Sequence, residues 1–165
     1  MNTQKSPAAV SAEKLANQVS ELLQAGGTLG DVFDYTEQDY EVLYALGHSL
    51  YSQARYHDAV KAFGFLVMHN HLERRFIGAL ASSLQMVKSY DEAFSYYSLA
   101  SVMDLADPVP TFHSAECLIA LGRVDDARKC LDMVVRQCLQ PDQEALKLRA
   151  QSLLQLVDSK SGVKS

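Results

Sequence analysis

The chain has 165 residues, 48% of them hydrophobic and 21% charged, which is ordinary for one soluble globular domain. Its net charge of −5 argues against nucleic acid as the main partner, because phosphate binding needs a basic surface. Residues 1–7 have no apolar core of a signal peptide, and the longest apolar run, residues 65–68, is too short to cross a membrane. We therefore expect a cytoplasmic protein with no membrane partner. Its three cysteines should be buried thiols rather than disulfides.

The first predicted element is an amphipathic helix within residues 11–35, preceded by a disordered segment, residues 1–10. Its apolar stripe consists of Leu15, Val19, Leu22 and Leu23. Gly26-Gly27 should end the helix, and the pattern Thr28-x-x-Asp31 should start a short helical turn. The polar face lacks the basic excess of a membrane-surface helix. We therefore interpret the stripe as a surface for self-association or docking.

A 34-residue repeat follows. Four columns of similar residues recur with this period: Gly47, Ala81 and Ala115; Leu50, Leu84 and Leu118; Ala59, Ala93 and Ala127; Phe63, Tyr97 and Leu131. The small residues allow two helices to approach closely, and the large residues fill the space between units. The period and the columns resemble the tetratricopeptide repeat, a helix–turn–helix unit that buries its apolar face only by stacking. We place three units at residues 40–73, 74–107 and 108–141.

Helix start signals agree with these boundaries. The pattern Thr36-x-x-Asp39 is typical of a capping box, and Asp107-Pro108 places a proline at the start of the third unit. A last helix, residues 142–158, has an apolar stripe formed by Leu146, Ala150, Leu153, Leu154 and Val157 that should cover the open end of the stack. The predicted fold is all-α, a short right-handed superhelix over residues 36–158. Residues 159–165 should form a disordered tail.

The order of these elements resembles one family, the class II chaperones of bacterial type III secretion (SycD/LcrH/IpgC type). The resemblance rests on Gly26-Gly27-Thr28-Leu29, on Leu43-Tyr44-Ala45-Leu46-Gly47 followed by Tyr51, and on residues 107–117 with Phe112-His113-x-Ala115-Glu116-Cys117. It covers roughly residues 12–158. It implies a homodimeric bacterial cytoplasmic chaperone that holds an extended N-terminal segment of a hydrophobic, pore-forming translocator protein in its concave groove. A general scaffold with repeats, or a co-factor of virulence regulation, is the alternative function.

The first helix of each such repeat lines the concave face through its second, fifth, ninth and twelfth positions. The predicted peptide-binding residues are Tyr44, His48, Tyr51, Gly78, Ser82, Gln85, Phe112, Glu116 and Ile119. Aromatic residues would supply apolar walls, and Gly78 and Ser82 would leave room for a close approach. The alternative for any one of these aromatics is packing beneath the N-terminal segment.

Two constellations could suggest other chemistry. His69-Asn70-His71 with Glu73 matches no closed zinc site. His113 and Cys117 stand one helical turn apart, but a Cys–His nucleophile also needs an oxyanion hole and an orienting group, which the sequence does not indicate. We therefore expect no catalysis, no metal and no cofactor.

Overall fold

A computed structural model of the chain describes residues 14, 17 and 19–161. The residues that it describes form helices and turns, and none of them forms a strand. In chain order the helices are α2 (Leu29–Val32), α3 (Glu37–Ser52), α4 (Tyr56–His69), α5 (Arg74–Met86), α6 (Tyr90–Met103), α7 (Val109–Ala120), α8 (Val124–Gln137), a 3₁₀ turn (Pro141–Gln143) and α9 (Glu144–Ser161). Residues 19–24 are helical as well. The predicted disorder of residues 1–10 and 162–165 lies outside the described residues.

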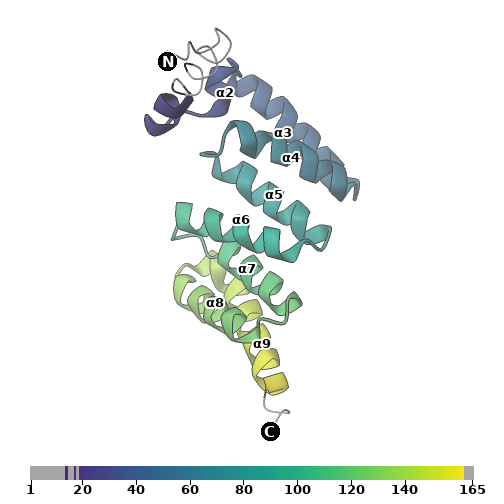
Figure 1. Cartoon of the computed structure of the whole chain (residues 1–165). Helices are drawn as coiled ribbons and strands as arrows, with labels where there is room; N and C mark the ends of the chain where they lie inside the picture. Colours follow the sequence, from purple (N-terminus) through teal and green to yellow (C-terminus); the bar gives the residue numbers. More distant parts are fainter. Residues whose placement is uncertain (1–13, 15–16, 18, 162–165) are drawn as a thin grey trace, which may run out of the picture.

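The helices stack in chain order along one axis, with α3 near one end and α9 at the other (Figure 1). From α3 to α9 each α-helix packs on the next one in the sequence, so α3–α4, α5–α6 and α7–α8 are helical pairs, while α2 packs on α4. This confirms the predicted all-α repeat architecture. In the part of the chain described, no helix is long and apolar enough to pass through a membrane.

The repeat columns lie where the helices of a pair meet. Ala59, Ala93 and Ala127 have no exposed surface. A Cβ atom added to Gly47 would come within 2.7 Å of the Phe63 ring, so this position needs a residue without a side chain. The large column residues, which include Phe63, are buried as predicted. Close packing at fixed intervals therefore explains the recurring residues.

The turns inside the pairs repeat as well. Ala54, Lys88 and Gly122, spaced 34 residues apart, have positive φ angles of 58°, 64° and 74°. The residue after each donates its backbone N–H to the carbonyl of the recurring leucine five positions earlier, at 2.9 Å in all three units (Arg55 to Leu50, Ser89 to Leu84, Arg123 to Leu118). This is a Schellman-type helix end, which needs one left-handed residue.

The two predicted capping boxes are confirmed, whereas α7 begins at Val109, with Pro108 as its N-cap residue rather than its first helical residue. Thr28 and Asp31 form a capping box at α2, and Thr36 and Asp39 form another at α3. Before α2, Gly26 adopts a φ of +83° and ends the preceding helix, as expected.

The core divides into two clusters along the stack. The first lies between α3 and α6 and contains Phe63, Phe76 and Tyr97. The second contains Phe112, Leu131 and Val134, against which the predicted stripe of α9 packs. The last helix therefore covers the end of the third pair, although it continues to Ser161, beyond the predicted start of the tail.

Candidate functional site: a row of pockets along the first helices

Three neighbouring pockets follow the first helices of the pairs. The first pocket, about 340 Å³, is lined by Tyr44, His48, Tyr51, Phe63, Arg75, Gly78, Ala79 and Ser82. The second, about 440 Å³, is lined by Glu73, Arg74, Arg75, Gly78, Ser82, Tyr97, Ala100, Asp107, Val109, Pro110 and His113. The third, about 380 Å³, is lined by Phe112, Glu116, Leu148, Arg149, Ser152 and Leu153. Because the pockets are built on α3, α5, α7 and α9 in turn, they form a row along the stack.

The first pocket has aromatic walls with polar edges. Tyr44 and Tyr51 are half-buried, and the Ser82 hydroxyl donates a hydrogen bond of 2.9 Å to the Tyr51 hydroxyl. The Arg75 guanidinium lies 5.1 Å from the centre of the Tyr44 ring and pairs with Glu41. The aromatic ring faces can contact an apolar side chain of a bound peptide, and the neighbouring hydroxyls can form hydrogen bonds with the peptide backbone.

Gly78 lies between the first and second pockets. It lines both, together with Arg75 and Ser82. A Cβ atom at Gly78 would meet nothing within 4 Å, so the space above this position is open. A bound chain could therefore pass from one pocket to the next over the surface of α5.

The third pocket is covered by the last helix. Phe112 forms its base and has no exposed surface in the core cluster that it shares with Leu131 and Val134, and the Arg149 guanidinium lies 4.7 Å from the centre of its ring. Leu148 and Leu153 of α9 complete the apolar wall. The Phe112 side chain is thus present in the row of pockets but is not open to solvent in this structure.

A chain of polar contacts connects the second and third pockets. The Tyr97 hydroxyl donates to Gln85 at 2.8 Å, and the Gln85 amide donates to Glu116 at 3.1 Å. The His113 Nδ1 atom lies 2.8 Å from the same Glu116 oxygen. Burial opposes the charge on Glu116, but the contacts with His113 and Gln85 outweigh it, and the pKa of this carboxyl is lowered. Burial raises the pKa of Tyr97, so the phenol stays a hydrogen-bond donor.

The structure distributes the predicted groove residues over several sites. The first pocket collects Tyr44, His48, Tyr51, Gly78 and Ser82. Gln85 joins the polar chain, and Phe112 and Glu116 line the third pocket.

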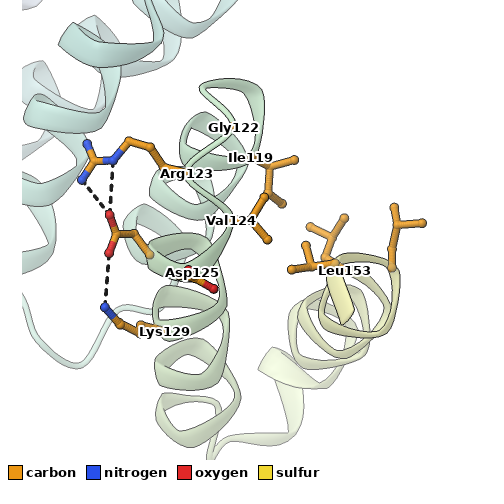
Figure 2. Close-up of a pocket in the computed structure, with 10 residues that line it drawn as sticks. Ile119, Gly122, Arg123, Val124, Asp125, Lys129 and Leu153 are labelled. Atoms are coloured by element: carbon orange, nitrogen blue, oxygen red, sulfur yellow. Dashed lines mark hydrogen bonds and ion pairs between the residues drawn. The ribbon is translucent and has the colours of Figure 1, made fainter. Parts of the chain in front are cut away.

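Ile119 lies apart from the row of pockets. It lines a separate cleft of about 970 Å³ between the α7–α8 turn and α9, where it and Val124 face Leu153 (Figure 2). Val124 stands at the repeat position that holds Tyr56 and Tyr90 in the earlier units, and a smaller residue leaves this space open.

The predicted self-association stripe is described only in part. Val19 and Leu22 are half-buried and Leu23 is 46% exposed, whereas Leu15 lies outside the described residues. Leu22 packs closely over Gly27, since a Cβ atom there would come within 2.5 Å of its side chain. Leu23 is therefore the most exposed of the described residues in the predicted self-association stripe.

One residue of each constellation considered for chemistry is buried, whereas His71 is exposed. His69 is buried, and its Nδ1 atom lies 2.8 Å from the Phe65 carbonyl. Cys117 is fully buried, and burial raises the pKa of its thiol to about 12, which opposes a nucleophilic role.

Comparison with known proteins identifies the family to which this chain belongs. A tetratricopeptide repeat family model matches residues 40–68 and 76–107. The Low calcium response locus protein H of Yersinia pseudotuberculosis is 31% identical over 139 residues, which are 84% of this chain and 83% of the relative. The chain belongs to the translocator chaperones of type III secretion.

Solved structures of similar proteins agree with this family. A chain of a T3SS complex from Aeromonas hydrophila superposes with a TM-score of 0.84 at 31% identity, covering 90% of this chaperone and 99% of that chain. The chaperone SycD of Yersinia enterocolitica, in complex with a peptide of the translocator YopD, gives a TM-score of 0.72 at 31% identity over 76% and 97% of the two chains. SycD is also known in an alternative dimer.

Sequence reasoning missed several residues that shape the pockets of this chaperone. Arg75 occupies the inward-facing second position of its unit and His113 is on a first helix, but neither is among the predicted binding residues, while Tyr97 was assigned only to packing between units. Arg149 belongs to the last helix, which was treated only as a cover. The carbon stem and planar head of an arginine can cover an aromatic ring, and this property was the available signal for Arg75 and Arg149.

Proposed function

We propose that this chain is a cytoplasmic chaperone that binds an extended, N-terminal segment of a hydrophobic translocator protein along its row of pockets. The observation that carries the proposal is the continuity of the first and second pockets across Gly78, with open space above it. The YopD peptide bound to SycD supports the same class of client.

The physical chemistry of such a client explains why it needs this partner. A translocator has apolar segments meant for a membrane, and these aggregate when exposed in water. A groove built on rigid helices orders the bound segment at a lower entropic cost than flexible loops would. The chain then acts by binding alone, without catalysis.

We propose Tyr44, His48, Tyr51, Gly78 and Ser82 as the principal contacts, because they border the first pocket and have accessible surface. Gln85 and Glu116 offer hydrogen-bonding groups farther along the stack. Phe112 has no exposed surface in the free chain, so it contributes only if the packing around its ring opens on binding. Ile119 contributes only if the client extends to the cleft at the α7–α8 turn.

Self-association is proposed to use the N-terminal stripe, since Leu23 presents an apolar side chain there and SycD forms dimers. Leu23→Glu should then shift the purified protein from dimer to monomer in sedimentation velocity. An unchanged sedimentation coefficient would move the interface elsewhere.

Co-expression tests the proposed function. The chain is produced together with the hydrophobic translocator encoded nearest to its own gene, and the soluble fraction of that translocator is measured with and without the chain. We expect a stable complex and a large gain in soluble translocator. A translocator that stays insoluble, or that is soluble alone, would refute the proposal.

A further inference from the structure

The third pocket has an unusual combination of groups for a site that should receive apolar anchors. Its base is an aromatic ring, its side wall carries the carboxylate of Glu116, and the guanidinium of Arg149 lines it beside both groups. An aromatic face beside a carboxylate attracts a cation. The chain thus supplies its own cation to this pocket.

The contacts of Arg149 are loose. Its nearest guanidinium nitrogen lies 3.6 Å from Glu116 Oε1, which is too long for a good hydrogen bond, and its side chain is 61% exposed. Exposed ion pairs of this kind contribute little stability, so the arginine can leave at small cost.

Glu116 remains well held when Arg149 leaves. Gln85 and His113 both contact its other carboxylate oxygen, Oε2, at 3.1 and 2.8 Å. Within the described part of the chain, no hydrogen bond reaches Oε1. The pocket therefore keeps a fixed, available acceptor beside the Phe112 ring.

We infer that the third pocket is a subsite for a basic side chain of the bound segment, and that the Arg149 guanidinium takes the position of this side chain, over Phe112 and beside Glu116, in the free chaperone. On binding, a lysine or arginine of the client takes the place of the Arg149 guanidinium over Phe112 and donates a hydrogen bond to Oε1 of Glu116. Arg149 then turns toward solvent. The inference rests on the proposed function for its biological ligand, but the pocket chemistry can be tested without any client.

The probe is N-acetyl-arginine N-methylamide, and its uncharged isostere is the citrulline derivative. Binding to the full chain is followed by the NMR signals of the Phe112 and His113 rings. We expect saturable binding of the arginine probe, with an affinity about fivefold higher in Arg149→Ala than in the unmodified chain. The reason is that the weak ion pair between Arg149 and Glu116 leaves the site free of Arg149 in roughly a fifth of the chains. Lys129→Ala removes an exposed cation of α8 and serves as the matched control with unchanged binding.

The selectivity of the third pocket among three probes tests the inference. The citrulline probe and N-acetyl-leucine N-methylamide should bind at least tenfold more weakly than the arginine probe, and Glu116→Gln in the Arg149→Ala background should remove the preference. Equal binding of the three probes would overturn the inference, as would equal affinity of the unmodified chain and Arg149→Ala. Because the probes need no translocator, a negative result here leaves the co-expression experiment unaffected.

Discussion

Gly78 offers a test in which stability and binding should change in opposite directions. It lies inside α5, and a Cβ atom there would meet nothing within 4 Å. Glycine inside a helix is less favourable than alanine or leucine by about 1 kcal/mol, so Gly78→Leu should stabilise the fold by roughly that amount. For a protein of this size the melting temperature should then rise by about 2–4 °C.

The same leucine should block client binding, because Gly78 borders both the first and the second pocket. Each buried apolar anchor contributes about 1.5–3 kcal/mol, so excluding one from each pocket costs about 3–6 kcal/mol. The affinity should fall by roughly two to four orders of magnitude. Calorimetric titration with the translocator segment and thermal unfolding of the free protein give the two quantities separately.

Gly64 provides the matched control. It lies inside α4, also has nothing within 4 Å of an added Cβ atom, and lines none of the three pockets. Gly64→Leu should raise the melting temperature similarly and leave client affinity unchanged. If Gly78→Leu binds the client normally, the segment does not cross α5 at this point and the proposed path is wrong.

Three further changes should affect stability in defined ways. Lys88→Gly should stabilise by about 0.5–1 kcal/mol in urea unfolding, because Lys88 has a φ of +64° that glycine adopts without strain. Phe112→Ala should cost about 3–5 kcal/mol, since the ring has no exposed surface, and a loss below 1 kcal/mol in the same assay would contradict its burial. The lowered pKa of Glu116 contributes stability that is present above its ordinary value of 4.5 and is lost as the pH falls through the lowered value. Glu116→Gln should therefore flatten the fall in melting temperature below pH 4.5, and an unchanged slope would exclude this contribution.

The repeat architecture could be predicted because its constraints recur at fixed intervals. A close helix contact accepts only small residues, so Gly47 and Ala93 reveal their positions through the residue type alone. Capping boxes are equally local, since Thr36 and Asp39 contact each other across three residues. Such features depend on neighbours in the chain or in the adjacent unit, which the sequence pattern contains.

The covering of the third pocket could not be predicted in the same way. Helical position indicates that Phe112 points toward the row of pockets, but it does not indicate that α9 places the Arg149 guanidinium 4.7 Å from the centre of its ring. The last helix has no second helix of its own in the repeat pattern, so no column indicates its orientation. Ile119 shows the same effect, because the small Val124 and the course of α9 place it in a separate cleft.

Side-chain contacts between successive first helices explain how the pockets keep a common geometry. Tyr51 with Ser82 joins α3 to α5, Gln85 with Glu116 joins α5 to α7, and Glu116 with Arg149 joins α7 to α9. In a stack whose units touch only their neighbours, such contacts fix the relative position of adjacent first helices. The first two links are hydrogen bonds of normal length, whereas the last is a long ion pair. The first helices are therefore joined more tightly along α3, α5 and α7 than between α7 and α9, which is the contact that the inferred displacement of Arg149 would break.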